Sequence, residues 1–338
     1  MHPEKIVLLR ALPGLGDMLC ITPALVALRT NFPETEITLI GDSWAASWAM
    51  RYKGYLDKFI EFPGFPGMEQ GWKSHALFIE FLKYAVQENY DVALQVHGSG
   101  SISNFFISLL GAKITGGFYS PSSYCPDSDT FLEWVEEESE SGRYCRLLRC
   151  LGIPVHSNEL IFPMTEQDEL EFQRLKSRDL VTDKPIACIH PGASSVLRIC
   201  PLEVFVKVAR QLSEMGYQVV LTGTERDAVY TRQISRMLGE QITDLTGKTS
   251  LGCLGKLVQE SAIVICNDTG ISHIADAMKT KSVVIFMESP PSRWAPQDYS
   301  LHRIVDARGL DICDFPVQEI AEKILLEVKF LLEKPCGA

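Results

Sequence analysis

A strand leads directly into a helix in the segment Ala262-Ile263-Val264-Ile265-Cys266-Asn267-Asp268-Thr269-Gly270-Ile271-Ser272-His273. Ala262–Cys266 is an apolar run of strand length, and the spacing of apolar residues predicts a helix over Ile271–Met278. The free N–H groups at such a helix start favour an anion, and Gly270 lets a phosphate approach the backbone closely. Asp268 either caps this helix or accepts a sugar or ribose hydroxyl. An ordinary capped helix with a core histidine is the competing interpretation.

The same alternation of strand and helix extends from this segment towards both ends of the chain. In the C-terminal half we expect strands at Ile186–His190, Tyr217–Thr222 and Ser282–Phe286, and helices at Leu202–Met215, Asp227–Leu238 and Leu251–Ser261. In the N-terminal half we expect strands at Lys5–Arg10, Glu36–Ile40 and Asp91–Val96, and helical stretches at Asp17–Thr30, Trp72–Glu88 and Ser101–Leu110. Pro23 lies inside the first predicted helix and should kink or restart it.

Short strands separated by helices predict parallel sheets with right-handed crossovers. We therefore expect an α/β fold of two facing, Rossmann-like, doubly wound parallel-sheet domains with a ligand cleft between them. The charged segment Met164–Lys184 marks the boundary. The expected division is an N-terminal domain at 1–165, a linker at 166–184 and a C-terminal domain at 185–338. The sequence leaves open whether the C-terminal helix packs back on the N-terminal domain.

The composition excludes several classes of protein. The chain has 338 residues, of which 46% are hydrophobic, and a formal net charge of −11. Such an acidic chain is a poor nucleic-acid binder, because phosphate backbones require a basic face. No apolar run reaches 18 residues, so neither a transmembrane helix nor a signal peptide is expected. The ten cysteines form no C-x-x-C pair, which favours free thiols in the cytoplasm.

A second anion-binding loop is predicted at His190-Pro191-Gly192-Ala193-Ser194-Ser195, with Arg198 following. A glycine and two hydroxyls before a helix suit phosphate oxygens, and Arg198 could clamp a diphosphate. A capped helix with a surface arginine is the alternative. Two such loops at the carboxyl ends of strands in one domain together favour a diphosphate ligand.

The first strand is followed by Pro13-Gly14-Leu15-Gly16-Asp17. This turn lacks the third glycine of a dinucleotide fingerprint, and a carboxylate in it would repel pyrophosphate. The position suits a catalytic base better, because a helix start stabilises an anionic carboxylate. Simple N-capping by Asp17 explains the pattern equally well.

Two acidic features are assigned no function. Asp127-Ser128-Asp129 matches a metal–diphosphate pattern, but no apolar strand precedes it, and we expect it to cap a helix. Glu133–Glu140 contains five glutamates, which a solvated helix face explains. No histidine pair has metal-ligand spacing, so no metal is predicted.

Together these segments resemble glycosyltransferase family 9, the ADP-heptose–lipopolysaccharide heptosyltransferases. The matching segments are Gly14-Leu15-Gly16-Asp17, Thr22-Pro23-Ala24-Leu25, His190-Pro191-Gly192-Ala193-Ser194, Thr246-Gly247, Ser250-Leu251, Asn267-Asp268-Thr269-Gly270, Ser272-His273, Ala275 and Arg293-Trp294. They keep the family's order over roughly residues 5–305.

The resemblance implies a GT-B fold, with the acceptor on the N-terminal half and the nucleotide-sugar donor on the C-terminal half. It implies an inverting, metal-independent transfer of a sugar, heptose by family default, from a donor such as ADP-heptose to a glycan or glycolipid such as the lipopolysaccharide inner core. The catalytic residues implied are Asp17 as the base, Arg10 near it and Arg198 as a clamp on the leaving group. The donor-binding residues implied are Ser194, Ser195, Glu225, Asp268, Thr269, Gly270 and His273. Gly16 and Glu288 are placed on the sugar side, and no cofactor is implied beyond the co-substrate.

The chain departs from the family pattern at three places. Arg198 stands where the family usually has lysine, and a tryptophan usual near Cys200 is absent. The family favours Gly-Pro-Thr where this chain has Met287-Glu288-Ser289, which bears on the donor sugar. The loop Phe62–Gly67, within the aromatic segment 59–72, faces the acceptor or a membrane, or simply packs.

Two alternative functions remain open from the sequence. One is a sugar-nucleotide epimerase of similar fold, and the other is a degenerate, non-catalytic member that binds a nucleotide or glycan. The expected location is the cytoplasm, with peripheral contact at the cytoplasmic face of the inner membrane as a further option. The oligomeric state stays open.

Overall fold

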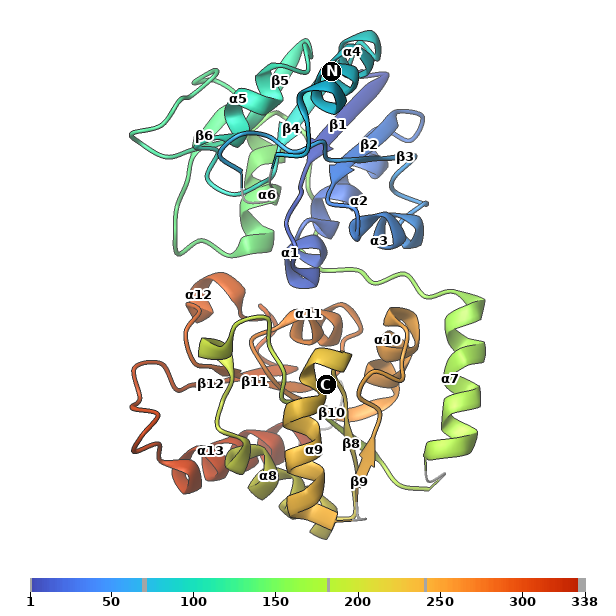
Figure 1. Cartoon of the computed structure of the whole chain (residues 1–338), viewed down its shortest axis with the longest axis vertical. Coiled ribbons are helices and arrows are strands. Elements are labelled where there is room, and N and C mark those ends of the chain that lie inside the picture. Colours follow the sequence, from blue (N-terminus) through green and yellow to red (C-terminus); the bar gives the residue numbers. More distant parts are fainter. Residues whose placement is uncertain (1, 69–71, 181–182, 240–241, 334–338) are drawn as a thin grey trace. The chain divides into compact units, whose positions relative to one another are not determined.

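The sheets of this protein are built from short apolar strands that are buried on both faces. In β1 (Lys5–Leu9) four of five residues are buried, and in β7 (Ile186–His190) all five are. Continuous apolar runs of this kind are typical of parallel sheets with helices on both sides. The structure is a computed structural model that describes residues 2–68, 72–180, 183–239 and 242–333. It divides into two compact units, Met1–Leu160 and Ile161–Ala338 (Figure 1).

The first unit contains a six-stranded parallel sheet in the order β3-β2-β1-β4-β5-β6. Its strands are β1, β2 (Glu36–Gly41), β3 (Lys58–Glu61), β4 (Val92–Gln95), β5 (Ile114–Tyr119) and β6 (Phe131–Glu133). Its helices are α1 (Leu15–Cys20), α2 (Thr22–Asn31), α3 (Ala45–Arg51), α4 (His75–Gln87), α5 (Ser103–Ser108) and α6 (Glu140–Cys150). The chain adds β2 and β3 on one side of β1 and then β4, β5 and β6 on the other, so the strand order reverses between β1 and β4. The loops after these two strands are therefore the expected ligand position.

The second unit repeats this topology in the order β12-β11-β10-β7-β8-β9. Its strands are β7, β8 (Gln218–Leu221), β9 (Ile242–Asp244), β10 (Ser261–Asn267), β11 (Ser282–Phe286) and β12 (His302–Asp306). Its helices are α7 (Glu166–Asp179), η1 (Val196–Arg198), α8 (Leu202–Glu214), η2 (Glu225–Asp227), α9 (Ala228–Leu238), α10 (Leu251–Glu260), α11 (Gly270–Ala277), α12 (Pro291–Trp294) and α13 (Val317–Glu333). Here the switch lies between β7 and β10. The predicted α/β class, with two doubly wound parallel sheets, is confirmed.

Side-chain alternation along β7 shows how the second sheet is covered. Ala187 and Ile189 face the cluster formed with α8 and α13, whereas Ile186 packs on the opposite face with α7 and α10. This is the period of two that a strand imposes on its side chains. The sheet is therefore buried on both sides, and its carboxyl-end loops are the part left for chemistry.

The division between the units falls earlier than the expected boundary at 166–184. Thr165 and Asp168 form a capping box that starts α7, and α7 packs its Phe172 and Leu175 with α10. This helix, visible in light green in Figure 1, belongs to the second unit rather than to a linker. The C-terminal helix α13 likewise packs on α8 within the second unit.

The first predicted helix is interrupted, as Pro23 indicates. It is divided into α1 and α2 at Ile21, and Pro23 occupies the first turn of α2, where its missing N–H costs nothing. The Thr22 hydroxyl donates to the Leu19 carbonyl at 2.7 Å across the break. The short α1 leaves Asp17 in its first turn, beside the end of β1.

The aromatic loop after β3 is packed. Phe62 is 2% exposed, and Phe65 lies 5.7 Å from the Phe106 ring and 5.6 Å from that of Phe78. Residues 69–71 of the expected segment 59–72 lie outside the described residues. Among the helices that the structure describes, none is both long and apolar enough to cross a bilayer.

Candidate active site

Arg10 is the centre of the polar network in the first unit. It follows β1 directly and is fully buried. Its Nε donates to the Asp17 carbonyl at 2.8 Å, and its Nη1 donates to the Val96 carbonyl and to the Tyr144 hydroxyl. The guanidinium thus ties the ends of β1 and β4 to α1 and α6, at the switch point of the sheet.

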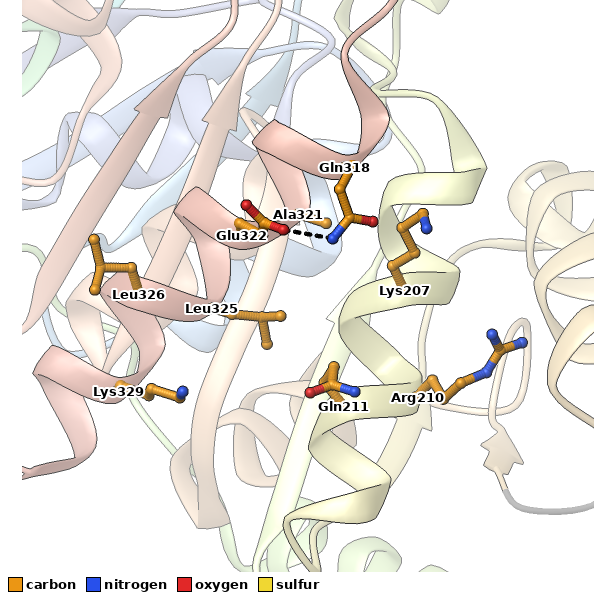
Figure 2. A pocket seen from close by; sticks show the side chains of 9 residues that line it. All are labelled: Lys207, Arg210, Gln211, Gln318, Ala321, Glu322, Leu325, Leu326 and Lys329. Atoms are coloured by element: carbon orange, nitrogen blue, oxygen red, sulfur yellow. Dashed lines mark hydrogen bonds between the residues drawn. The ribbon is translucent and has the colours of Figure 1, made fainter.

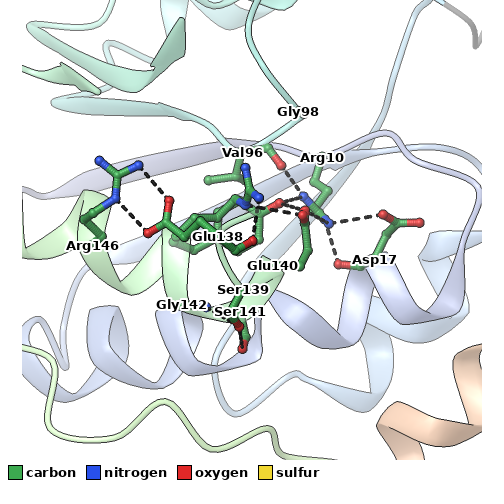
Figure 3. Close-up of polar contacts among 12 residues, drawn as sticks. Arg10, Asp17, Val96, Gly98, Glu138, Ser139, Glu140, Ser141, Gly142 and Arg146 are labelled. Atoms are coloured by element: carbon green, nitrogen blue, oxygen red, sulfur yellow. Dashed lines mark hydrogen bonds and ion pairs between the residues drawn. The ribbon is translucent and has the colours of Figure 1, made fainter. Parts of the chain in front are cut away.

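Two carboxylates share the Arg10 cation (Figure 3). Its Nη2 lies 3.5 Å from Asp17 Oδ1 and 3.4 Å from Glu140 Oε1. Burial alone would lower the pKa of Arg10, but the neighbouring Tyr144, Asp17 and Glu140 outweigh burial and raise that pKa. Arg10 therefore remains a cation in the core.

Asp17 differs from its neighbours because it reaches the surface. Its side chain is 25% exposed, whereas those of Arg10 and Glu140 are buried. The carboxylate bends back over Gly14, where any Cβ would overlap it. Gly14 thus leaves room for a carboxylate at the start of α1, fixed on one side and accessible on the other, and the neighbouring Gly16 is partly buried. Such a group can accept a proton from a bound hydroxyl.

His97 also belongs to the polar network of the first unit, and its sequence context did not single it out. It follows β4, and its Nδ1 accepts from the Ala11 backbone N–H at 3.1 Å. Burial, assisted by the Arg10 charge, lowers the pKa of His97 to about 3. The ring is therefore neutral, and its hydrogen lies on Nε2.

The expectation that Glu133–Glu140 is a solvated helix face is wrong. Glu133 ends β6, a loop follows, and α6 begins only at Glu140, which is buried. The carboxylate of Glu140 is 1% exposed and accepts from the Tyr144 hydroxyl. Glu140, Arg143 and Tyr144 stand at positions i, i+3 and i+4 of α6, which places them on one face. That spacing could have indicated a polar network on one face of a helix, but the surrounding glutamates obscured it.

The expected helix cap at Asp127-Ser128-Asp129 is also wrong. Asp127 Oδ1 accepts from the Asp129 N–H at 2.9 Å, and the turn leads into β6 instead of a helix. Short acidic side chains favour such turns as strongly as they favour caps.

In the second unit, Asn267 joins the two predicted anion-binding loops. Its Oδ1 accepts from the Cys200 N–H at 3.1 Å, and its Nδ2 donates to the Pro191 carbonyl at 2.7 Å. Asn267 is fully buried at the end of β10, next to β7. One amide side chain thereby fixes the loop after β7 against the loop after β10, at the switch point of the second sheet.

Arg198, Ser194 and Asp268 form a polar cluster on these loops. Arg198 Nη1 donates to the Asp268 carbonyl at 3.4 Å and lies 3.7 Å from Asp268 Oδ2. Its Nη2 donates to the Ser194 hydroxyl. The Asp268 side chain is 3% exposed and that of Arg198 is 26% exposed. The Arg198 guanidinium is thus fixed by Ser194 and Asp268 and remains partly accessible to a ligand.

The start of α11 lies beside this cluster in the sequence. Thr269 precedes α11 with an extended backbone, and its side chain makes no capping hydrogen bond. The Ser272 hydroxyl donates to the Thr269 carbonyl at 2.7 Å. His273 is 5% exposed, with its ring edge-on to Trp294 at 6.1 Å. The first N–H groups of α11, at Gly270 and Ile271, give this end a partial positive charge that favours an anion.

The remaining predicted residues lie on separate loops. Ser195 Oγ accepts from the Leu197 N–H at 3.3 Å, so it caps η1. Glu225 is exposed at the start of η2, and a Cβ at Gly247 would lie 2.9 Å from its Cγ. Glu288 is exposed after β11. The structure therefore brings Arg198, Ser194 and Asp268 into contact and leaves Glu225 and Glu288 on the loops after β8 and β11.

Asp227 is a buried residue of these loops that sequence reasoning missed. Its Oδ2 accepts from the Thr224 N–H and hydroxyl, both at 2.7 Å. Its carboxylate occupies the space where side chains at Gly192 and Gly223 would project. Both glycines are thus needed for the loops after β7 and β8 to close on Asp227. The Thr224–Asp227 spacing of a capping box was the signal.

A cavity of about 500 Å³ on the second unit does not belong to this site. It lies between α8 and α13 and is lined by Lys207, Arg210, Gln211, Gln318, Ala321, Glu322, Leu325, Leu326 and Lys329. Figure 2 shows Arg210 directed away from α13, so the cations around it do not converge. None of the predicted site residues lines it. We therefore place the candidate site on the strand-end loops, where the hydrogen-bonded polar groups are.

Known proteins resemble this chain in sequence and in fold. The chain matches glycosyltransferase family 9 (heptosyltransferase) over residues 80–313, more than half of its length. It is 25% identical over 296 residues to lipooligosaccharide heptosyltransferase 2 of Haemophilus influenzae, covering 83% of each chain. A family 9 glycosyltransferase from Veillonella parvula has a similar structure, with a TM-score of 0.78, 20% identity and 98% of each chain covered. An E. coli heptosyltransferase solved with ADP gives a TM-score of 0.70 at 13% identity, covering 96% of this chain and 99% of that one.

Proposed function

The chain belongs to glycosyltransferase family 9, the heptosyltransferases, and from this premise we propose that it transfers heptose from ADP-heptose to a sugar of the lipopolysaccharide inner core. The observation that carries the proposal is the cluster in which Arg198 is fixed by Ser194 and Asp268 at the strand-end loops. A partly exposed guanidinium held in this way suits a diphosphate, because its fork matches phosphate oxygens.

The donor is proposed to bind on the second unit. Arg198 and the start of α11 would hold the diphosphate, together with Ser194, Ser195, Thr269, Gly270 and His273. Asp268 would accept a hydroxyl of the ribose or the sugar. Glu225 would approach the ribose, and Gly16 and Glu288 the sugar. ADP as the nucleotide is supported by the E. coli relative that was solved with ADP.

The first unit is proposed to supply the base. The acceptor hydroxyl oxygen attacks the anomeric carbon, and the bond from that carbon to the β-phosphate oxygen breaks with its electron pair leaving on ADP. The hydroxyl proton passes to the Asp17 carboxylate. Attack opposite to the leaving group inverts the anomeric centre. Arg198 and the helix N–H groups stabilise the charge that develops on ADP, and Arg10 steadies Asp17.

A transfer assay tests this proposal. The purified chain is incubated with ADP-heptose, with and without inner-core acceptor that lacks the heptose, and products are separated by mass spectrometry. We expect heptosylated acceptor and free ADP in equal amounts, only in the presence of acceptor, and no effect of a chelator. Conversion of the donor without acceptor would indicate the epimerase instead. Activity that requires a divalent metal would contradict the mechanism.

A further inference from the structure

Glu140 is the most deeply buried carboxylate around Arg10, and the proposed reaction does not use it. It is the first residue of α6 and is 1% exposed. Its Oε1 lies 3.4 Å from Arg10 Nη2 and accepts from the Tyr144 hydroxyl, while its Oε2 lies 3.3 Å from Arg143 Nε. The carboxylate is thus enclosed by two guanidinium groups and a phenol.

Arg143 is fixed by Trp134 and by the backbone carbonyl of Glu138. Its side chain is fully buried, its guanidinium stacks over the Trp134 ring at 3.6 Å, and its Nη2 donates to the Glu138 carbonyl at 2.7 Å. Because Arg143 cannot swing away, the Glu140 carboxylate stays where it meets Arg10.

Stability does not explain this arrangement. Removing charges from water is costly, and a buried ion pair is often no more stabilising than well-packed apolar residues of the same volume. A buried Arg–Glu–Arg arrangement beside a partly exposed carboxylate therefore points to a role in the site itself.

The distances show what that role is. Arg10 Nη2 lies nearly midway between Asp17 Oδ1, at 3.5 Å, and Glu140 Oε1, at 3.4 Å. A cation that interacted with Asp17 alone would favour the charged carboxylate and weaken it as a base. The charged and titratable groups around this centre are Arg10 at the end of β1, His97 at the end of β4, Glu140 and Tyr144 on α6, and Cys20 on α1 itself. His97 is neutral, so Glu140 is the anion that offsets Arg10.

We propose that Glu140 is a positioning residue for the Arg10–Asp17 pair: its carboxylate orients the guanidinium and shares its charge, so that Asp17 stays able to accept the proton of the acceptor hydroxyl. The inference rests on the proposed role of Asp17 as the base. It assigns to α6 a direct influence on the rate of transfer although Glu140 does not reach the surface.

The variant E140Q tests the proposal, and E138Q is its matched control. Glu138 lies two residues away, and its carboxylate pairs with Arg146 at 2.8 and 2.7 Å. E138Q keeps the backbone carbonyl that accepts from Arg143. With ADP-heptose and inner-core acceptor, E140Q should lower kcat at least tenfold and leave the KM for ADP-heptose unchanged. The acid side of its pH–rate profile should move to lower pH by about one unit, because Arg10 without the Glu140 charge would lower the pKa of Asp17. E138Q should behave as the wild type.

A second measurement needs no substrate. The carboxyl carbon signal of Asp17, assigned by its loss in D17N, is followed by NMR as a function of pH. Its midpoint should move down in E140Q and stay in place in E138Q. If the wild-type chain transfers no heptose, the proposed function fails, and this titration still decides the role of Glu140.

Y144F carries the test if E140Q does not fold. It keeps every charge and removes the hydroxyl that joins Arg10 to Glu140. A reduced kcat with an unchanged KM for ADP-heptose supports the proposal. A wild-type kcat in Y144F, or an E140Q enzyme with the profile and titration of E138Q, overturns it.

Discussion

At the scale of single residues, Arg198 of the second unit is a partly exposed cation in a fixed orientation. Arg198 is bound through the Ser194 hydroxyl and through two oxygens of Asp268, so its charge is neither mobile nor fully neutralised. Preorganised charge of this kind stabilises a leaving group without rearranging during the reaction. The family usually has lysine here, and arginine adds a fork that can bind two phosphate oxygens at once.

Replacing Arg198 should therefore damage the reaction in a graded way. R198A should lower kcat by about 10²–10³-fold, the range found when one charge-stabilising donor is removed. R198K should lose less, because it keeps the charge and loses only the fork geometry. Steady-state kinetics with ADP-heptose measures both. R210A, on α8 beside the 500 Å³ cavity, is the control and should match the wild type; equal kinetics of R198A and R210A would exclude Arg198 from the site.

From the sequence, candidate residues that reach the surface are easier to single out than buried ones. Asp17 and Arg198 stand in glycine-containing turns directly after apolar strands, and this local context is visible in one dimension. Glu140 stands after a run of more exposed glutamates, and only its contact with Arg10 in the folded chain separates it from them. Tertiary contacts decide burial, so the run of glutamates gave no indication that Glu140 is buried.

At the scale of elements, strand prediction succeeded where apolar runs were long. β7, β10 and β11 are nearly continuous apolar segments. β9 has three residues and β12 reads His-Arg-Ile-Val-Asp, so their strand character comes from pairing with a neighbour. α7 was missed because its composition is charged, although its Thr165–Asp168 capping box marks its start.

The contact between α10 and the segment before α7 makes a sharp test of packing. A Cβ at Gly255 of α10 would overlap the ring of Phe162, which is 5% exposed. G255A should therefore lower the free energy of unfolding by about 1–3 kcal/mol, the usual cost of overpacking. Denaturant titration measures this change.

G142A in α6 is the matched control, because its added Cβ would meet only the Ser139 side chain, with Cβ at 3.4 Å and Oγ at 3.6 Å. Alanine generally favours a helix over glycine by about 1 kcal/mol. G142A should therefore keep or slightly raise the stability. A stabilising G255A would show that Phe162 does not press on α10.

At the scale of the whole molecule, one topology is used twice with different chemistry. Each unit places its polar groups on the loops after the two strands that flank its switch point. The first unit presents a carboxylate there, and the second presents a cation and a helix start. The chain pattern predicted both sheets, since strand–helix alternation determines parallel connectivity. The position of the boundary depended on α7, which the pattern did not reveal.

His190 and His302, two of the buried histidines of the second unit, predict how its stability depends on pH. Burial lowers the pKa of His190 to about 4 and that of His302 to about 4. Both values lie below the unfolded value near 6.5, so between these limits the unfolded chain binds more protons. The contribution of these two histidines to stability is therefore fully present above about pH 6.5 and is lost as the pH falls towards 4. Each histidine contributes about 1.4 kcal/mol per pH unit over that window.

Urea unfolding of the second unit between pH 7 and pH 5 measures this slope. Carboxylates titrate mostly below that range, so the histidines dominate it. H302N should reduce the slope by about 1.4 kcal/mol per pH unit, because one of the two groups no longer titrates. An H302N slope equal to the wild-type slope would show that His302 is protonated as readily in the folded chain as in the unfolded one.

The central claim is that Asp17 of the first unit acts as the base while the second unit binds the donor. Turnover by D17N, measured beside its affinity for ADP-heptose, tests it most directly. We predict that D17N loses at least about a hundredfold in kcat, the lower range for a general base, while its Kd for ADP-heptose matches the wild type. A D17N enzyme whose kcat stays within about tenfold of the wild type, roughly 1.4 kcal/mol of barrier, would contradict the account.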